Sequence, residues 1–350
     1  MPICAIMRIL YVGNSGGLEN SDRFYLFPQR IINGLIRNGH FVQIFNDKDV
    51  ARLSNPFKSS RLGINKTNNF LLKNCHDFQP NLVIISHCQF IKNETLSDIR
   101  KICQNVKIIH LNVDPLSETK NRNTLNKRLD NVDGIFITTA GDALKEFSTH
   151  STFSAFIPNL VDDSIDIGRA FENKNCDTDL FFAAGAMRTN DHRQSMASDI
   201  IKNLPHIKMD IYGAGINNKK IFGHNYLDKL SSSKMGLIIN KTEDYYLYSS
   251  DRMTHYMANG LMVFAHESPR YQDVLGNDTF VSYHSTPDLI DKIKYYYTHD
   301  AERIRIAQNG YEKIHQVFHQ KMVTEYLVDM SFNTIRRQYP WPTEKFGGNH

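Results

Sequence analysis

The fold is decided by one stretch of the sequence, residues 235–265, which reads MGLIINKTEDYYLYSSDRMTHYMANGLMVFA. It opens with the apolar run Met235–Asn240, passes through a polar turn and continues as a predicted helix at Arg252–Asn259. Gly260 ends that helix, and the apolar run Leu261–Ala265 follows directly. Short apolar runs that alternate with amphipathic helices are typical of βαβ units, whose strands are parallel. The stretch therefore predicts one such unit.

The same alternation extends through the chain in both directions. A chain of 350 residues is too long for one ordinary core, and 41% hydrophobic residues are enough for two. We therefore expect an α/β fold of two Rossmann-like, doubly wound parallel-sheet domains that face a cleft. The predicted order is an N-terminal domain at residues 1–162, a polar connection at 163–179, a C-terminal domain at 180–320, and a helix at 321–340 that crosses back to the first domain, with a loose tail after it. The strands that support this order include Arg8–Val12, Phe41–Phe45, Leu82–Ser86, Lys107–Leu111, Leu180–Ala184 and Lys208–Tyr212.

Composition excludes several classes of protein. The net charge of +4 is too small to indicate nucleic acid binding, so we expect no nucleic acid partner. No apolar run approaches the ~18–20 residues of a membrane span. The five cysteines show no CxxC spacing and indicate reduced thiols. We expect a cytoplasmic protein, and we leave open its oligomeric state and a peripheral attachment to the inner face of the membrane through basic helices such as Ala301–Lys313.

The first strand ends in a glycine-rich turn, which reads GNSGG. Glycine lets the backbone approach a ligand closely, and ligands bind at the carboxyl ends of strands in open α/β sheets. The turn lacks GxGxxG spacing, so we do not expect a dinucleotide. A tight turn that only the backbone requires is the alternative. The candidate ligand-binding residues of this turn are Gly13, Asn14, Ser15, Gly16 and Gly17.

Another strand, Lys107–Leu111, leads into the segment HLNVDP. Asn112 and Asp114 place an amide and a carboxylate at this strand end, and Pro115 stiffens the turn. Asp114 is our candidate for a catalytic base or a group that binds a hydroxyl. An Asp-Pro turn that only caps the next element is equally compatible.

Two further turns follow strands of the C-terminal half. The sequence GAMRTNDHR at 185–193 combines a glycine turn, a helix start and two arginines, which predicts an anion site with a diphosphate as its natural ligand. Solvated arginines on an exposed turn are the alternative. The sequence IYGAG at 211–215 lets a nucleoside lie against the backbone, unless it is an ordinary turn. The candidates here are Gly185, Arg188, Arg193, Tyr212 and Gly213.

The strongest candidate is the segment YSSDRMTHYMANG at 248–260. Ser249, Ser250 and Asp251 supply groups for the N-terminal cap, and the helix start offers free N–H groups and a positive dipole end. Arg252 lies in the first turn, where its charge opposes the dipole unless an anion is present. This arrangement predicts a diphosphate site. We expect no metal site, because the histidines form no HExxH pair, and no cofactor.

In the order of its motifs, the chain resembles the GT-B glycosyltransferases, and among them the CgeB-like, spore-maturation branch of families 1 and 4. The resemblance rests on RILYVG at the start, NVDP at 112–115, IPNLVD at 157–162, Arg193, and SSDRMTHYMANG at 249–260, which is similar to the family's S-x-R-x-x-E-x-x-A-x-G helix. It implies transfer of a sugar from a nucleotide-sugar donor to a glycan, lipid-linked or protein acceptor, without a metal and with retention. It also implies a role in the synthesis of cell-envelope polysaccharide.

The resemblance also implies roles for the candidate residues. Arg252, Arg193 and the helix start would neutralise the leaving diphosphate, and Ser250 would bind a phosphate oxygen. Asp114 and Arg252 would be the catalytic residues, with Asp114 contacting the acceptor or acting as a base. The implied donor-binding residues of the C-terminal domain are Gly185, Arg188, Arg193, Tyr212, Gly213, Ser249, Ser250, Asp251, Arg252 and His255, and those on the acceptor side of the N-terminal domain are Gly13, Asn14, Ser15, Gly16, Gly17 and Asn112.

One position departs from the family pattern. His255 stands where many retaining members carry a glutamate that holds the donor ribose, and Leu247 stands at the place of an earlier glutamate. Either another group holds the ribose, or the donor is unusual, or activity is lost. The alternatives are therefore a catalytically inactive sugar-binding or assembly protein, and a nucleotide-sugar epimerase that uses Asp114 together with Glu243 or Asp244.

Overall fold

The computed structural model describes residues 6–17, 20–185, 191–213, 216 and 219–348. The chain divides into two compact units. Unit 1 combines Met1–Pro158 with Gln320–His350, and unit 2 is Asn159–His319. Residues 163–179, which we expected to be a connection, are part of unit 2.

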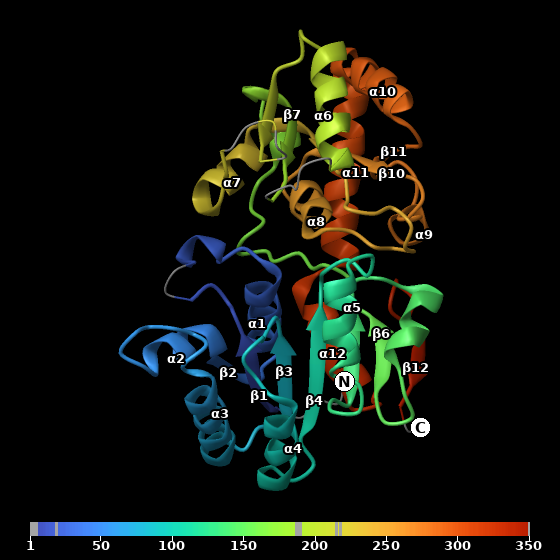
Figure 1. The fold of residues 1–350 in the computed structure, drawn as a ribbon. Coiled ribbons are helices and arrows are strands. Elements are labelled where there is room, and N and C mark those ends of the chain that lie inside the picture. The colour runs from blue at the N-terminus through green and yellow to red at the C-terminus, as the bar shows by residue number, and fades with distance from the viewer. Residues whose placement is uncertain (1–5, 18–19, 186–190, 214–215, 217–218, 349–350) are drawn as a thin grey trace. The chain divides into compact units, whose positions relative to one another are not determined.

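Unit 1 is built on a seven-stranded sheet with the order β12-β6-β5-β4-β3-β1-β2 (Figure 1). Strands β1 to β6 pair in parallel, and β12 pairs antiparallel with β6 at the edge. The interior strand β3 is buried at every position, as expected where helices cover both faces of a parallel sheet. The strands are β1 (Arg8–Gly13), β2 (Phe41–Phe45), β3 (Leu82–Ser86), β4 (Lys107–Asn112), β5 (Gly134–Ile137), β6 (Phe153–Phe156) and β12 (Lys345–Gly347).

The helices of unit 1 follow the predicted alternation, with one addition. Helix α5 was not predicted, because its sequence TKNRNTLN buries only Leu125 and so carries almost no apolar periodicity. A 3₁₀ helix, Gly141–Phe147, lies between β5 and β6. The helices are α1 (Phe27–Arg37), α2 (Asp47–Leu53), α3 (Ile64–Phe78), α4 (Asn93–Ile102), α5 (Thr119–Asn126) and α12 (Gln320–Ser331).

The C-terminal segment is integrated into unit 1. Helix α12 packs on α1, where a Cβ atom on Gly34 would lie 2.6 Å from the Gln320 carbonyl oxygen, so only glycine allows this approach. The helix ends at Ser331, earlier than the predicted 340. The tail is not loose as expected, because Tyr339 packs at 4.9 Å on Tyr326 and β12 then adds to the sheet.

Unit 2 contains a five-stranded parallel sheet with the order β11-β10-β9-β7-β8. The chain runs from β7 outward to β8 and then returns to the other side of β7 as β9. Such a reversal leaves a crevice at the carboxyl ends of the two strands beside it, which is where ligands bind in doubly wound sheets. The strands are β7 (Thr178–Ala183), β8 (Met209–Tyr212), β9 (Ser233–Leu237), β10 (Met262–His266) and β11 (Val281–Tyr283).

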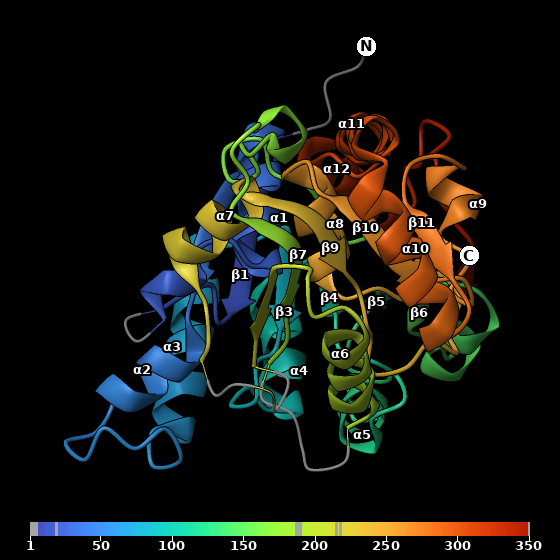
Figure 2. The same ribbon diagram turned by 90° about the horizontal axis from the view of Figure 1, so that it is seen from above.

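Helices cover the sheet of unit 2 and bury its apolar strands. Helices α10 and α11 lie beside β10 and β11 in both ribbon views (Figures 1 and 2). Phe182, Leu237 and Phe264 are among the fully buried core residues. The prediction of two doubly wound parallel α/β domains is therefore confirmed. The helices are α6 (His192–Asn203), α7 (Gly223–Ser231), α8 (Asp251–Ala258), α9 (Gln272–Leu275), α10 (Thr286–Thr298) and α11 (Asp300–Val317).

Candidate functional site

The turn between β9 and α8 is organised by Asn240, which is 1% exposed. Its side-chain oxygen accepts a hydrogen bond from the Ser250 backbone N–H at 3.2 Å. Its amide nitrogen donates to the Glu243 carboxylate at 2.9 Å and to the Tyr271 hydroxyl at 3.1 Å. One buried amide thus connects the end of a strand to the start of a helix. Our sequence reasoning did not single out Asn240, although its place directly after an apolar strand was a signal.

Arg252 lies at the point where the strand order reverses. Its Nη1 donates to the Ala183 carbonyl at the end of β7 (3.0 Å), and its Nη2 donates to the Ile239 carbonyl just beyond β9 (2.9 Å). Its Nε donates to the Ser250 hydroxyl at 3.1 Å. Carbonyl and hydroxyl oxygens orient a guanidinium but leave its charge in place. In the part of the chain that the structure describes, no carboxylate forms a salt bridge with Arg252.

Helix α8 starts at Asp251, one residue before the predicted Arg252. Ser250 is the N-terminal cap, with φ −70° and ψ 155°, and its side chain makes no cap hydrogen bond. Ser249 is held by Asn159, whose amide donates to the Ser249 carbonyl at 3.0 Å and to its hydroxyl at 3.3 Å. Asp251 is the first helical residue. Asn159 belongs to the segment IPNLVD, so that segment supports the helix start, a role that the sequence did not reveal.

His255 lies one turn further along α8 and faces the interior. It is 2% exposed, and its Nδ1 lies 3.3 Å from the Tyr226 hydroxyl of α7. The two rings meet edge to face at 5.9 Å. His255 therefore packs within unit 2 and takes part in joining α8 to α7.

The start of helix α6 differs from the prediction of an open anion site. Arg193 is 5% exposed, and its Nε and Nη2 donate to the two carboxylate oxygens of Asp191 at 2.8 and 2.5 Å. These hydrogen bonds lower the pKa of Asp191 to about 2. The neighbouring His192 approaches the α8 turn instead, with Nε2 3.0 Å from the Asn240 carbonyl oxygen. Arg188 lies outside the described residues.

The remaining turn residues of unit 2 lie at the carboxyl ends of β7 and β8. Gly213 has φ +70°, and a Cβ atom there would lie 2.2 Å from the Ala184 carbonyl oxygen. Position 213 therefore requires glycine, because two strand ends approach each other closely there. Tyr212 is half-buried, 5.9 Å from the Phe181 ring, and Gly185 has no atom within 4 Å of an added Cβ. Gly185 is thus the open position among these residues.

Glu243 is the buried carboxylate of the α8 turn. Burial raises its pKa, and both of its oxygens accept hydrogen bonds from Asn240. Asp244 accepts from the Thr242 hydroxyl at 2.7 Å. Both carboxylates are engaged in shaping the turn, which weakens their candidacy as acid and base of an epimerase.

In unit 1, the turn GNSGG is closely packed. A Cβ atom on Gly13 would lie 2.0 Å from the Ser86 carbonyl oxygen, and one on Gly17 would lie 2.3 Å from the Asp49 carboxylate. Asn14 stabilises the turn by accepting a hydrogen bond from the Gly16 N–H at 3.1 Å. A hollow of about 100 Å³ beside the turn is lined in part by Asn14, Ser15 and Gly16. Packing therefore explains two of the glycines, and the hollow leaves room for a small group.

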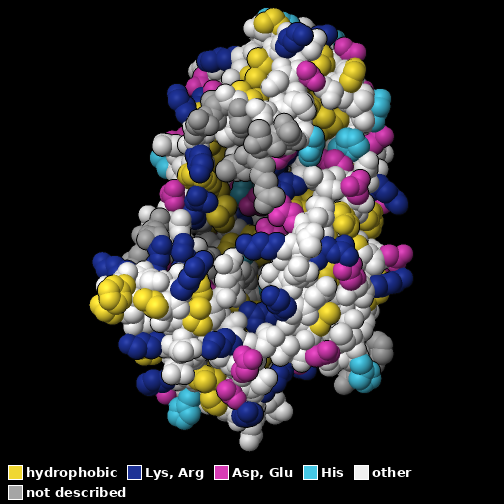
Figure 3. Space-filling view, in the orientation of Figure 1, with side chains coloured by type: hydrophobic (Ala, Val, Ile, Leu, Met, Phe, Trp, Pro, Cys, Tyr) yellow, Lys and Arg dark blue, Asp and Glu magenta, His cyan; other side chains and the backbone are white. Residues whose placement is uncertain are grey.

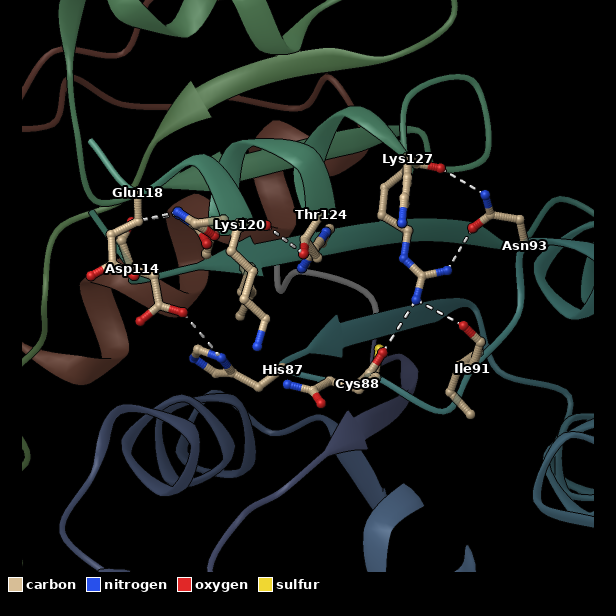
Figure 4. A pocket seen from close by; sticks show the side chains of 15 residues that line it. His87, Cys88, Ile91, Asn93, Asp114, Glu118, Lys120, Thr124 and Lys127 are labelled. Atoms are coloured by element: carbon tan, nitrogen blue, oxygen red, sulfur yellow. Dashed lines mark hydrogen bonds and ion pairs between the residues drawn. The ribbon is translucent and has the colours of Figure 1, made fainter. Parts of the chain in front are cut away.

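Unit 1 also contains a pocket of about 550 Å³ at the carboxyl ends of β3 and β4 (Figure 4). Asp114 lies on its rim, 3.6 Å from His87 Nδ1, and remains 56% exposed. Asn112 donates to the Asp114 carbonyl at 2.9 Å. His110 is buried in the lining, and this burial, together with the Arg128 charge, lowers its pKa to about 3. The structure thus brings Asn112 and Asp114 together at one pocket, with a neutral imidazole in its wall.

Three short motifs in the sequence escaped our prediction. GNSGG fits the GxSxG pattern of serine hydrolases. Among the described residues, however, no histidine hydrogen-bonds Ser15. Asp177 and Asp179 have DxD spacing but pair with Lys229 and Lys234.

The third motif is HxxxH at His315 and His319, and both imidazoles contact Asp163. No group of three or more His, Cys, Asp or Glu side chains arranged to hold a metal occurs in the described ranges.

Residues 188–329 match the family described as glycosyl transferase-like, and the matched segment contains the whole α8 turn. The chain therefore contains a glycosyltransferase-like domain. No curated protein sequence matches the chain significantly.

Solved structures extend the likeness to nearly the whole chain. A sucrose-phosphate synthase from Thermosynechococcus elongatus has a TM-score of 0.64 at 12% identity, covering 93% of this chain and 98% of that one. The Anabaena HepE protein in complex with UDP and glucose has a TM-score of 0.62 at 11% identity, covering 94% and 100%. A UDP-forming trehalose-phosphate synthase from Burkholderia xenovorans has a TM-score of 0.57 at 10% identity, covering 95% and 100%. The fold is thus that of the GT-B glycosyltransferases.

Proposed function

We propose that this protein transfers a sugar from a nucleotide-diphosphate-sugar donor to an acceptor, and that the α8 turn of unit 2 binds the donor diphosphate. The observation that carries the proposal is the position of Arg252. Its guanidinium sits at the strand-order reversal, fixed by two backbone carbonyls, and its charge is not neutralised by a carboxylate salt bridge among the described residues. The glycosyl transferase-like match over 188–329 and the UDP-bound HepE structure support this choice of ligand.

The chemistry at this site is electrostatic. Breaking the bond between sugar and diphosphate leaves negative charge on the diphosphate. Arg252 and the N–H groups at the start of α8 are already oriented to stabilise that charge. The Ser250 hydroxyl accepts a hydrogen bond from Arg252 Nε and so helps to fix the orientation of the guanidinium. A pre-oriented cation and helix start can serve this role without a metal ion, which is why we propose a metal-independent reaction.

We assign the other predicted residues according to their contacts. Arg193 holds the start of α6 through Asp191, and His255 joins α8 to α7, so we infer that the donor ribose is held by another group. Asp114 remains our candidate for contacting the acceptor, because its carboxylate is exposed at a pocket. A place in the CgeB-like branch and retention of configuration remain proposals from the order of the motifs.

A thermal-shift series tests the donor site. We expect UDP and other nucleoside diphosphates to raise the melting temperature. The nucleoside diphosphate that gives the largest shift identifies the base of the donor. Arg252→Ala should abolish the shift. Arg270→Ala is the matched control, because Arg270 is an exposed arginine of unit 2 that pairs with Asp273. No shift with any nucleoside diphosphate in the wild-type protein would contradict the proposal.

Two alternatives have specific readouts. A catalytically inactive sugar-binding protein would show the thermal shift but no release of nucleoside diphosphate from any sugar donor. An epimerase would interconvert donor sugars without an acceptor. The engagement of both Glu243 oxygens by Asn240 speaks against the epimerase, which needs a free acid and base.

We further propose that peripheral membrane attachment, if lipid-linked acceptors are used, runs through residues 53–66 of unit 1. None of the described helices is long and apolar enough to cross a bilayer. Leu53, Phe57 and Leu62 are 67%, 79% and 63% exposed. Figure 3 shows hydrophobic side chains gathered at the left edge of unit 1, where the α2–α3 connection lies in Figure 1. Lys58 and Arg61 lie between Phe57 and Leu62, as expected for a segment that meets anionic lipid.

A sedimentation assay with vesicles of neutral phospholipid and of mixed neutral and anionic phospholipid tests the attachment. Phe57→Ser should reduce the fraction that sediments with anionic vesicles. Ile167→Ser, at an apolar side chain that is 75% exposed in unit 2, should not. Equal sedimentation of both variants would exclude this segment. Cytoplasmic location itself remains a prediction from the cysteine pattern.

A further inference from the structure

The pocket of unit 1 contains an arginine whose charge has no carboxylate counterpart. Arg128 is 8% exposed. Its Nη1 donates to the Asn93 side-chain oxygen at 2.6 Å, and its Nη2 donates to the backbone carbonyls of Cys88 and Ile91 at 3.2 and 2.8 Å. Within the described ranges, no Asp or Glu forms a salt bridge with it. Buried charges are normally paired, because removing an ion from water costs far more than neutral hydrogen bonds return.

The rim of the same pocket adds more positive charge. Lys120, Thr124 and Lys127 also line the pocket, at positions four and three residues apart, so they lie on one face of α5 and its end. In Figure 4, Lys120 extends from α5 toward the loop that carries His87. Neither lysine has an ion-pair partner among the described residues. Figure 3 shows lysine and arginine side chains gathered over this part of unit 1.

The acidic groups of the pocket do not offset this charge at its inner end. The lining holds two carboxylates, Asp114 and Glu118, against three permanent cations. Asp114 is 56% exposed and faces His87. His110, in the wall near Arg128, is neutral at physiological pH, because burial keeps its pKa far below its usual range. The inner end therefore combines a fixed cation with a neutral polar group, and in Figure 4 Asp114 and Glu118 lie on the side of the pocket opposite the groups that hold Arg128.

We propose that this pocket binds the acceptor by a phosphate group, with Arg128 contacting the phosphate directly and Lys120 and Lys127 adding charge from α5. The inference rests on the proposed transferase function, since only a transferase needs an acceptor here. A phosphate matches the site because the planar guanidinium fork and flexible lysine ammonium groups are the side chains that bind its several oxygens. The volume of about 550 Å³ leaves room for a sugar ring beside the phosphate.

Binding of inorganic phosphate provides the first test. We expect phosphate, added at constant ionic strength, to raise the melting temperature of the wild-type protein. In the double variant Lys120→Gln/Lys127→Gln, the apparent Kd for phosphate should rise about tenfold. These lysines are exposed, so the variant should fold as the wild type does. The matched control is Lys73→Gln/Lys101→Gln, which removes two exposed lysines from α3 and α4.

The outcomes separate the two proposals. Equal phosphate binding by wild type, double variant and control would overturn the phosphate subsite, as would its absence in all three. The shift with UDP should be the same in the double variant, because it reports on unit 2. A UDP shift without phosphate binding would refute the subsite and leave the transferase proposal standing, and the reverse result would refute the donor site alone.

The source of the phosphate is resolved by competition. Glucose 6-phosphate represents a soluble sugar phosphate, geranyl phosphate represents a lipid phosphate, and uncharged glucose is the control. Displacement of bound phosphate by either phosphate ester supports the subsite and identifies the acceptor class. If glucose displaces phosphate as strongly as glucose 6-phosphate does, the pocket binds sugar hydroxyl groups rather than a charged phosphate. That result would overturn the proposal.

Discussion

Two helices of unit 2 carry an arginine at the same position, and the two arginines have different partners. Helix α6 and helix α8 each follow a parallel strand and carry an arginine within the first two residues, Arg193 and Arg252. Arg193 forms a two-fold hydrogen bond with Asp191, the cap of its own helix. Arg252 is held by the carbonyls of Ala183 and Ile239 instead. The comparison teaches that the partner of a cation, more than its place on a helix, decides whether its charge is available to a ligand.

The unit 1 pocket repeats the second arrangement. Arg128 is also fixed by two backbone carbonyls and a side-chain amide. A carbonyl oxygen carries a partial charge, so it orients the guanidinium while the full positive charge persists. An arginine that is rigid and still charged is pre-organised for an anion, because little side-chain entropy is lost when the ligand binds. Both proposed anion sites of this protein are built on that principle.

The largest expected effect is on catalysis, from Arg252→Ala. Removing a pre-oriented cation from a developing diphosphate should lower kcat/KM by about 10²–10³-fold, or ~3–4 kcal/mol. Arg252→Lys should restore little of the lost activity. A lysine ammonium lacks the planar fork of donors that lets Arg252 bind both carbonyls and the ligand at once. Steady-state kinetics with the donor found by thermal shift provides the measurement. If Arg252→Ala turns over at close to the wild-type rate, Arg252 does not stabilise the diphosphate and the proposed difference from Arg193 is wrong.

The matching variant of the other helix should act on stability. Arg193→Ala leaves Asp191 without its partner at the start of α6, and we expect a loss of about 2 kcal/mol in the free energy of unfolding. Binding of UDP should stay within a few-fold of the wild-type value. Urea denaturation and titration with UDP measure the two quantities. Loss of UDP binding with unchanged stability would instead assign Arg193 to the donor site, as the sequence alone had predicted.

The two arginines should also differ in how they affect the pH dependence of stability. The pKa of Asp191 is depressed in the folded protein to about 2, mainly by its hydrogen bonds with Arg193. A depressed carboxyl pKa contributes stability above the unfolded value of about 4, and this contribution is lost as the pH falls toward 2. His192, 3.8 Å from Asp191, is the neighbouring titratable group.

Asp191→Asn should therefore lose less stability than the wild type between pH 4 and pH 2, a window of about two units around these pKa values. Chemical denaturation at several pH values gives the comparison. Parallel curves for the two proteins would show that the pair does not stabilise α6 in this way. Arg252 has no carboxylate salt bridge among the described residues, so Arg252→Ala should leave the acid dependence unchanged.

The smallest expected effect comes from Ser250→Ala. The Ser250 hydroxyl accepts from Arg252 Nε at 3.1 Å and makes no cap hydrogen bond. Its removal should weaken the orientation of the guanidinium and raise the Kd for UDP by about five-fold, or ~1 kcal/mol. The melting temperature without ligand should barely change. A large fall in unliganded stability would show that Ser250 acts as a cap rather than through Arg252.

Much of the fold was predictable, and the failures have physical causes. The strands at Arg8–Gly13 and Leu82–Ser86 are continuous apolar runs, so burial on both faces of a sheet was evident. Helix α5 escaped notice because a helix with one buried residue has no apolar stripe. The C-terminal strand β12 escaped because its partner, β6, lies nearly two hundred residues earlier in the sequence.

The candidate site divides in the same way. The sequence indicated the α8 turn and the segment around Asp114, since polar residues directly after apolar strands fall at the functional edge of such sheets. Asn240 was missed although it directly follows an apolar strand, and Asn159 was missed because its partner, Ser249, lies 90 residues later in the sequence. Arg128 was missed because the loop that holds it lies about forty residues upstream.

By itself, the sequence of this protein determined the alternation of strands and helices, the two parallel sheets, and the places where polar turns interrupt apolar strands. These follow from local propensity and from the period of apolar residues, which any short window of the chain contains. Only the tertiary structure decided which arginines keep their charge for a ligand. That choice depends on whether a carboxylate or a backbone carbonyl reaches the guanidinium, and for Arg252 and Arg128 the reaching groups come from strand ends and loops that the fold brings together.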